Sequence, residues 1–338
     1  MKRNMKEFMK EWCDADHKKT MPILSFPIAQ KMGLNVTELL ADADTQAKGM
    51  RMLADEVDMA AAVTYMDLSI ETEAFGGLVT FADNEVPNVA DPVVKNREDA
   101  ENLKVPEVGD ARTGIYIEGC RKAVELIPEK PVLAGCIGPF SLVGRLMDIT
   151  EVILKCRREP ETIHLLLKKA TEFIIKYIKA YKEDAGANGV CMAEPLAGLL
   201  PPKQLKAFSS EYCKRIIDAV QDDNFIVIYH NCGSSTIKSV NEILYCGAAA
   251  YHFGNVIDME KMMEQFPEDQ IAMGNVDPAV EFCNGTPESI REATLSVMGK
   301  CCKYPNYIVS SGCDIPAHSP WENINAYFAA VEEFYSNK

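Results

Sequence analysis

Short apolar runs recur along the chain, and most of them are separated by longer amphipathic stretches. The runs are rich in valine, isoleucine, alanine and tyrosine, which is typical of strands that are buried on both faces of a parallel sheet. Several of them lead directly into a polar residue or a glycine. We therefore predict eight strands, at residues 22–26, 59–65, 131–136, 189–193, 225–229, 248–252, 270–273 and 307–311.

The stretches between these strands carry apolar residues at helical spacing. The expected helices are residues 3–19, 37–55, 113–127, 141–182 with a new start at Pro160, 201–219 and 320–335. Strands that alternate with helices in this number fit a (β/α)₈ TIM barrel better than an open, doubly wound sheet. The first helix would be an N-terminal helical extension, and the irregular residues 76–92 would form a loop or hairpin insertion after strand 2. We therefore predict an α/β protein in which residues 1–338 form one TIM-barrel domain.

The charge of the chain limits its partners. The formal net charge of −15 at pH 7 argues against binding to nucleic-acid phosphates or to an anionic membrane surface. No apolar stretch approaches the length of about 18 residues that a membrane-spanning helix needs, and residues 1–19 lack the apolar core of a signal peptide. Twelve cysteines, several of them inside apolar runs, suit a compartment that keeps thiols reduced. We therefore expect a cytoplasmic protein without nucleic-acid or membrane partners.

Candidate chemistry begins at the end of the fifth predicted strand, where His230 and Cys232 follow an apolar run. Residues two apart in an extended chain point to the same side, so the imidazole and the thiol can converge. Cys313 follows the eighth predicted strand, and in a TIM barrel the carboxyl ends of the strands surround one site. One imidazole and two thiols form a ligand set of the kind that holds catalytic zinc with one position open. The alternative is buried thiols beside a histidine that is satisfied by hydrogen bonds. We interpret His252, at the end of the sixth predicted strand, as a packed histidine rather than a ligand.

Several segments carry a resemblance that covers nearly the whole chain. They are residues 65–76, which include Asp67, and residues 138–142, 274–278, 311–316 and 320–323. With them the chain resembles the uroporphyrinogen decarboxylase superfamily and, at His230, Cys232 and Cys313, its branch of zinc-dependent methylcobamide:coenzyme M methyltransferases. Decarboxylases of this fold carry an arginine near the amino terminus that holds substrate carboxylates, but the equivalent residues 22–30 contain none. The resemblance therefore favours methyl transfer over decarboxylation.

The resemblance implies a zinc-dependent corrinoid methyltransferase, which moves a methyl group between a methyl-corrinoid and a thiol acceptor, coenzyme M or another, activated on zinc. The corrinoid (methylcobamide) would be carried by a separate corrinoid-binding protein, because the Asp-x-His-x-x-Gly pattern of corrinoid-carrying modules is absent from the sequence. Three alternatives stay open. One is a methyltransferase that loads a corrinoid protein from a methylated substrate, and another is uroporphyrinogen decarboxylase, which removes carboxylates from a tetrapyrrole and needs no zinc. The third is a non-catalytic protein that binds or stores zinc.

Two carboxylates are catalytic candidates in this interpretation. Glu194 would either occupy the fourth zinc position before substrate binds or accept hydrogen bonds from nearby backbone N–H groups. Asp67 would either line the pocket or anchor a loop.

Overall fold

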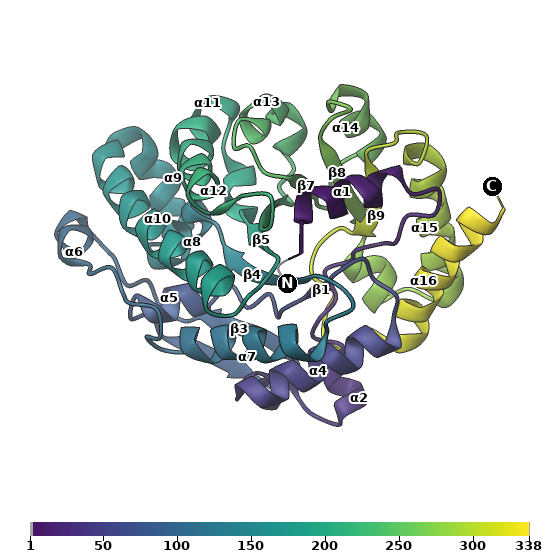
Figure 1. Ribbon diagram of the computed structural model, residues 1–338. Helices are drawn as coiled ribbons and strands as arrows, with labels where there is room; N and C mark the ends of the chain where they lie inside the picture. The colour runs from purple at the N-terminus through teal and green to yellow at the C-terminus, as the bar shows by residue number, and fades with distance from the viewer. Residues whose placement is uncertain (1–2, 338) are drawn as a thin grey trace.

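A curled sheet of parallel strands forms the centre of the protein (Figure 1). The computed structural model describes residues 3–337, and its main sheet has seven strands in the order β1-β4-β5-β6-β7-β8-β9. These are β1 (Ala62–Val63), β4 (Val132–Ile137), β5 (Gly189–Ala193), β6 (Ile226–Asn231), β7 (Ala250–Phe253), β8 (Ile271–Val276) and β9 (Tyr307–Ser311). Every neighbouring pair is parallel. The protein is therefore an α/β protein in which the seven strands of the main sheet all have their carboxyl ends at the same end of that sheet.

Alternate residues of each strand belong to two separate apolar cores. In β6, Val227 and Tyr229 join the large cluster beneath the outer helices. Ile226 and Ile228 join a smaller cluster that the sheet itself encloses. By the same alternation His230 lies on the enclosed side. The sheet therefore places polar side chains at its carboxyl end, directly beyond an apolar inner core.

The prediction of a strand at residues 22–26 is wrong, because this segment forms no regular strand. Pro22 has no N–H with which to continue a ladder. The next N–H, that of Ile23, donates to the Ser311 hydroxyl at 3.0 Å rather than to a carbonyl. The expected eight-stranded barrel is therefore a seven-stranded sheet with an irregular eighth segment.

This irregular segment still lies between the two edge strands of the sheet. The Thr20 carbonyl accepts a hydrogen bond from the Ala60 N–H at 3.0 Å, just before β1. The Met21 N–H donates to the Val309 carbonyl of β9 at 3.5 Å. Thr20 and Met21 thus connect β9 to the entry of β1 by hydrogen bonds, without a ladder.

Helices surround the outer face of the sheet (Figure 1). The main ones are α4 (Ala43–Glu56), α7 (Thr113–Leu126), α8 (Pro139–Leu146), α9 (Ile149–Arg158), α10 (Pro160–Glu183), α12 (Glu211–Val220), α13 (Val240–Leu244), α14 (Met259–Gln265), α15 (Pro287–Cys301) and α16 (Trp321–Ser336). The predicted helix at residues 141–182 is divided into α8, α9 and α10. The division is local, because Asp148 caps the amino end of α9 and Pro160 begins α10.

Helix α1 (Met5–Asp14) lies at the amino ends of the strands. Its first N–H groups, those of Met5 and Lys6, donate to the Asp223 carbonyl just before β6 at 2.8 and 3.0 Å. Met5, Met9 and Trp12 are buried and join the inner cluster. Helix α1 therefore covers the amino end of the inner core, opposite the polar strand ends.

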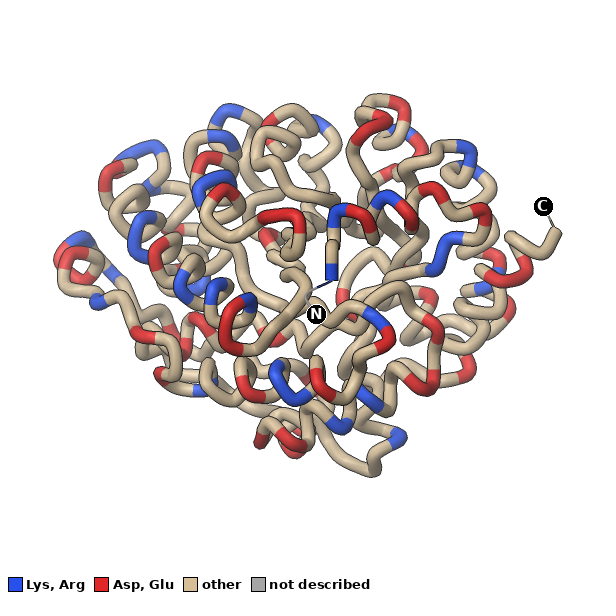
Figure 2. Tube along the Cα trace, in the orientation of Figure 1, with Lys and Arg blue, Asp and Glu red and all other residues tan. Residues whose placement is uncertain are grey.

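An antiparallel hairpin of β2 (Val79–Ala82) and β3 (Glu85–Val89) follows α5 (Ile70–Ala74). Acidic and basic residues are intermixed over the outer helices and loops (Figure 2).

Within residues 3–337 no helix combines the length and apolarity that crossing a membrane requires. All twelve cysteines lie in this described range, and none forms a disulfide.

Candidate metal centre

Three ligand atoms from two strand ends meet at the carboxyl end of the sheet. His230 is the second-last residue of β6, Cys232 follows that strand, and Cys313 follows β9. The ligand atoms of the three side chains all lie within 4.8 Å of one another. The imidazole of His230 is buried, and both cysteines are half-buried. The structure thus brings together the three residues that the sequence analysis selected as ligands.

The spacing of these atoms suits a tetrahedral zinc ion. Zinc binds thiolate sulfur at about 2.3 Å and imidazole nitrogen at about 2.0 Å, which places the sulfur and nitrogen of a tetrahedral site about 3.5 Å apart. The observed distance between Cys313 Sγ and His230 Nε2 is 3.6 Å. Three protein ligands leave one coordination position for a substrate, as in catalytic zinc sites. The donor set and this sulfur–nitrogen distance therefore both fit zinc.

The thiols of Cys232 and Cys313 interact with each other. The hydrogen bond with Cys313 lowers the pKa of Cys232 below its ordinary value. The same bond, together with burial, raises the pKa of Cys313 to about 12. A divalent cation binds the thiolate form and would displace both protons. Metal binding at this centre is therefore coupled to proton release.

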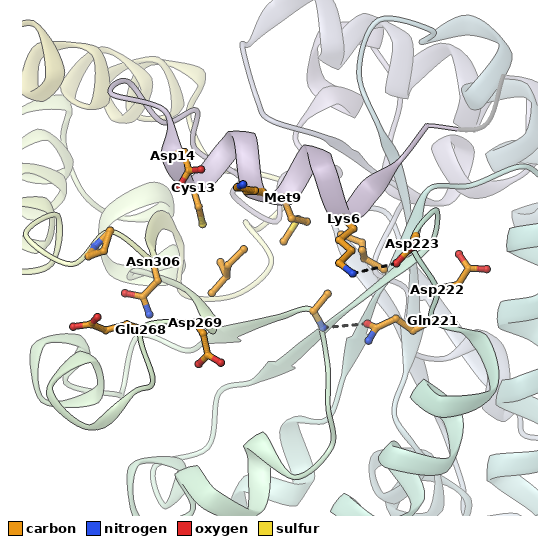
Figure 3. Close-up of a pocket in the computed structure, with 15 residues that line it drawn as sticks. Lys6, Met9, Cys13, Asp14, Gln221, Asp222, Asp223, Glu268, Asp269 and Asn306 are labelled. Atoms are coloured by element: carbon orange, nitrogen blue, oxygen red, sulfur yellow. Dashed lines mark hydrogen bonds and ion pairs between the residues drawn. The ribbon is translucent and has the colours of Figure 1, made fainter.

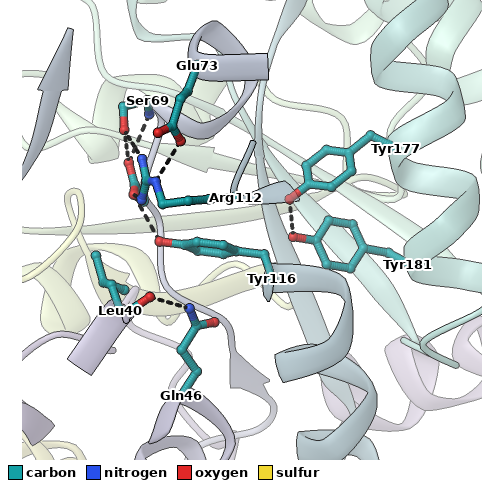
Figure 4. A network of polar contacts seen from close by, with 9 residues as sticks. Leu40, Gln46, Ser69, Glu73, Arg112, Tyr116, Tyr177 and Tyr181 are labelled. Carbon is teal, nitrogen blue, oxygen red and sulfur yellow. Dashed lines mark hydrogen bonds and ion pairs between the residues drawn. The ribbon is translucent and has the colours of Figure 1, made fainter. Parts of the chain in front are cut away.

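Figure 4 shows a separate buried network around Arg112 and Tyr116, and Asp67 belongs to it. Its carboxylate accepts hydrogen bonds from the Ser69 hydroxyl at 2.6 Å and the Tyr116 hydroxyl at 2.9 Å. The Arg112 guanidinium donates to it at 2.5 Å and to Glu73 at 2.6 Å. These contacts hold the loop after β1 against the start of α7, as in the loop-anchoring alternative.

Glu194 is fully buried beside the amino end of α8. Its carboxylate accepts hydrogen bonds from the Phe140 N–H at 2.8 Å, the Ser141 N–H at 2.9 Å and the Ser141 hydroxyl at 2.7 Å. A Cβ atom at Gly138 would lie 2.1 Å from Glu194 Cγ, so glycine at that position admits the side chain. The structure gives Glu194 partners in α8 and does not group it with the three ligands.

The substitution Glu194→Gln is expected to lower the free energy of unfolding by about 1–3 kcal/mol, the cost of an unsatisfied buried donor. The amide keeps the size of the side chain but offers one acceptor oxygen in place of two. Zinc content is expected to stay unchanged. Urea unfolding and metal analysis of the same preparation check both parts, and loss of zinc from a folded variant would return Glu194 to the ligand set.

Glu71 of α5 is another buried carboxyl group, near the network that contains Asp67. One of its oxygens accepts a hydrogen bond from the Ile137 N–H at 2.9 Å, and the other has no hydrogen-bond partner among the described residues. Burial raises the pKa of Glu71 from 4.5 to about 7. The folded protein therefore keeps a proton on Glu71 at pH values where the unfolded chain has lost it.

This raised pKa is expected to make stability fall as pH rises from about 4.5 through 7. One pKa unit corresponds to about 1.4 kcal/mol, so ionised Glu71 would cost about 3 kcal/mol at pH 8 relative to pH 4. Urea unfolding across this range should show wild type losing that amount relative to Glu71→Gln. The exposed Glu85→Gln is the control and should track wild type, and a Glu71→Gln variant that also tracks it would contradict the prediction.

Two contacts at this end of the barrel were not predicted. His252 Nδ1 lies 2.8 Å from His230 Nδ1, so the packed histidine touches a candidate ligand. This contact follows from the register of β6 and β7, in which the two histidines are paired. The register of two strands cannot be read from the sequence. Cys283 Sγ lies 3.1 Å from the Nε2 atom of His318, in the loop after β9.

A cavity of about 660 Å³ lies at the opposite end of the barrel, between α1 and the sheet (Figure 3). Met9 and Cys13 of α1 line it together with Asn306. At its edge Lys6 and Asp223 form an ion pair at 3.7 Å. The amino end of a TIM barrel generally contributes stability rather than chemistry, so we assign this cavity to the packing of α1.

Known proteins resemble the chain over most of its length. The methylcobamide:CoM methyltransferase MtbA of Methanosarcina acetivorans is 28% identical over 305 residues, which cover 87% of this chain and 86% of the relative. The uroporphyrinogen decarboxylase of Psychromonas ingrahamii is 24% identical over 290 residues, with coverage of 82% and 79%. The solved structure of a methyltransferase from Methanosarcina mazei superposes with a TM-score of 0.84 at 20% identity, covering 98% of this chain and 99% of that one.

That structural likeness shows the fold, and the family is shown by a match to a family model. The model described as uroporphyrinogen decarboxylase (URO-D) matches residues 19–334. This range contains the curled sheet and all three candidate ligands. The chain therefore belongs to the uroporphyrinogen decarboxylase family.

Proposed function

We propose that this protein is a zinc-dependent corrinoid methyltransferase, which moves a methyl group from a methyl-corrinoid to a thiol acceptor such as coenzyme M. The observation that carries the proposal is the convergence of the His230, Cys232 and Cys313 ligand atoms within 4.8 Å of one another, with the sulfur–nitrogen distance of 3.6 Å that suits a tetrahedral zinc site. The similarity to curated methylcobamide:CoM methyltransferases, at 28% identity, supports the same class of reaction.

In this function the protein positions a sulfur atom for attack on carbon. When bound, zinc supplies a Lewis acid that favours the thiolate form of the acceptor. Cys232 and Cys313 would offset the charge of the cation, whereas His230 adds a neutral ligand. In the methyl transfer the acceptor thiol would lose its proton to solvent, and its sulfur would bond to the methyl carbon. The electron pair of the broken cobalt–carbon bond stays on cobalt.

The remaining parts of the proposal concern the surroundings of this centre. We place the corrinoid on a separate corrinoid-binding protein that docks at the carboxyl end of the strands, and we place the reaction in the cytoplasm. Asp67 and Glu194 act as positioning residues, because each holds a loop or helix that follows a strand at this end.

Decarboxylation of a tetrapyrrole is the second candidate, favoured by curated decarboxylases at 24% and 25% identity. The same ligand set would also serve a methyltransferase that loads a corrinoid protein from a methylated substrate. The three reactions differ in what they consume, so substrate assays separate them.

The experiment is metal analysis of purified wild type together with a methyl-transfer assay. We expect about one zinc per chain and transfer from methylcobalamin to one or more thiols of a panel that includes coenzyme M and homocysteine. Removal of zinc by a chelator should abolish transfer, and added Zn²⁺ should restore it. Turnover of uroporphyrinogen by the zinc-free protein, without methyl transfer by the zinc-loaded protein, would overturn the proposal.

A further inference from the structure

A series of hydrogen bonds connects the candidate metal centre to the backbone carbonyl of Met21. His230 Nδ1 lies 2.8 Å from His252 Nδ1, and His252 Nε2 lies 2.8 Å from the Ser310 hydroxyl. The Ser310 hydroxyl donates to the Met21 carbonyl at 2.7 Å. His230 is 2% exposed, and His252 and Ser310 are fully buried. Solvent therefore does not compete for these bonds.

The fold brings the three side chains into one layer. His230 and His252 are register partners on adjacent strands. Ala250 of β7 and Ile308 of β9 both belong to the enclosed core, so His252 and Ser310, two residues further along, also point inward. All three polar side chains therefore lie just beyond the apolar inner core, where each finds a partner only among the others or in the backbone.

The hydrogen bond from Ser310 to the Met21 carbonyl determines the direction of the other hydrogen bonds in this series. A carbonyl can only accept, so the single hydroxyl hydrogen of Ser310 points to Met21. The Ser310 oxygen must then accept from the Nε2–H of His252. Among residues 3–337 no carboxylate forms an ion pair with His252, and its side chain is fully buried, so a charged imidazole would be uncompensated there and His252 is neutral.

A neutral His252 that is protonated at Nε2 has a bare Nδ1 atom, which can only accept. The hydrogen between the two imidazoles therefore resides on His230 Nδ1. His230 is left with a bare Nε2, and this is the atom that lies 3.6 Å from the Cys313 sulfur.

We propose that His252 and Ser310 form a relay that holds His230 in the tautomer protonated at Nδ1, with the lone pair of Nε2 directed at the metal. This inference rests on the proposed function for the presence of the metal, and it adds two positioning residues that do not touch the ion. Metal-binding histidines generally donate their second N–H to a carboxylate, carbonyl or water. Here the acceptor is a second neutral imidazole, so the relay orients the ligand without adding charge to the two thiolates.

The first test reads the tautomer directly in the metal-free protein. The chain has five histidines, so ¹⁵N-histidine labelling gives few signals, and a His230→Gln sample assigns those of His230. We expect His230 in wild type to carry its proton on Nδ1. In His252→Leu the acceptor is gone, and we expect signals of the Nε2-protonated form to appear. His252→Asn, whose amide oxygen can accept in place of Nδ1, should restore the wild-type tautomer.

The second test measures zinc affinity by competition with a chromophoric chelator. Loss of an outer partner of a metal-binding histidine typically lowers affinity by about 10–100-fold, and we expect that loss in His252→Leu, a smaller loss in Ser310→Ala and recovery in His252→Asn. The matched control is His164→Leu, because His164 also bonds a hydroxyl, that of Tyr212 at 2.8 Å, but lies on the outer helices. Its zinc affinity should equal that of wild type.

The outcomes separate the relay from the proposed function. Wild type with Nδ1-protonated His230 and tight zinc binding but no methyl transfer would support the relay and contradict the proposed function. Unchanged tautomer and unchanged zinc affinity in His252→Leu would overturn the relay even where methyl transfer is found. If circular dichroism shows that His252→Leu does not fold, Ser310→Ala decides, and wild-type zinc affinity in that variant would overturn the relay.

Discussion

Replacement of Cys313 by serine is expected to lower zinc affinity by more than about 100-fold and to remove methyl transfer in proportion, since loss of an outer-shell partner alone costs about 10–100-fold. The sulfur of Cys313 is the only one of the three candidate ligand atoms that comes from the segment after β9. Serine keeps the size of the side chain but replaces a thiolate with a neutral hydroxyl. The variant would leave His230 and Cys232, which is one ligand fewer than catalytic zinc sites generally have.

Zinc per chain after gel filtration, zinc affinity and the rate of methylcobalamin demethylation check this prediction in one set of samples. Cys13→Ser is the control, because Cys13 is equally half-buried but lies on α1 at the other end of the barrel. It should keep full zinc and full activity. A folded Cys313→Ser protein that does the same would exclude Cys313 from the metal centre.

The convergence of His230, Cys232 and Cys313 was predictable because it follows from the strand period. His230 and Cys232 are two residues apart at a strand end, and Cys313 follows another strand that ends on the same side. Parallel strands bring such ends together whatever the loops do. The apolar runs that define these strands are buried on both faces, which makes them readable in the sequence.

The surroundings of the ligands depend on contacts that the sequence pattern does not contain. The strand expected at residues 22–26 looked regular in composition, but Pro22 interrupts its ladder and its role is played by irregular hydrogen bonds. The contact between His230 and His252 depends on the register of β6 and β7. Glu194 could have faced either a metal or a helix, and only the position of α8 decides between them.

The strand pattern also does not indicate which residue pairs with Asp67. Arg112 lies at the start of α7 and far along the chain, where nothing in the spacing indicates an ion pair. Its guanidinium bonds Asp67, Glu73 and the Ser69 hydroxyl, the last at 2.9 Å. The side chain of Asp67 is 0% exposed and that of Arg112 13%, so water screens this pair little. The network in Figure 4 therefore ties the loop after β1 to the outer helices.

Arg112→Leu is expected to lower the free energy of unfolding by about 3–5 kcal/mol, because it leaves the charge of Asp67 buried without its partner. Arg121→Leu is the matched control: its ion pairs with Glu118 and Glu125 are exposed, and such pairs contribute less than about 1 kcal/mol. Urea unfolding of both variants and of Asp67→Asn/Arg112→Leu measures the difference. The double variant should recover part of the loss, since the uncompensated charge is gone. Equal stability of the two single variants would mean that Asp67 does not depend on Arg112, and the loop after β1 would then be held by its hydroxyl contacts alone.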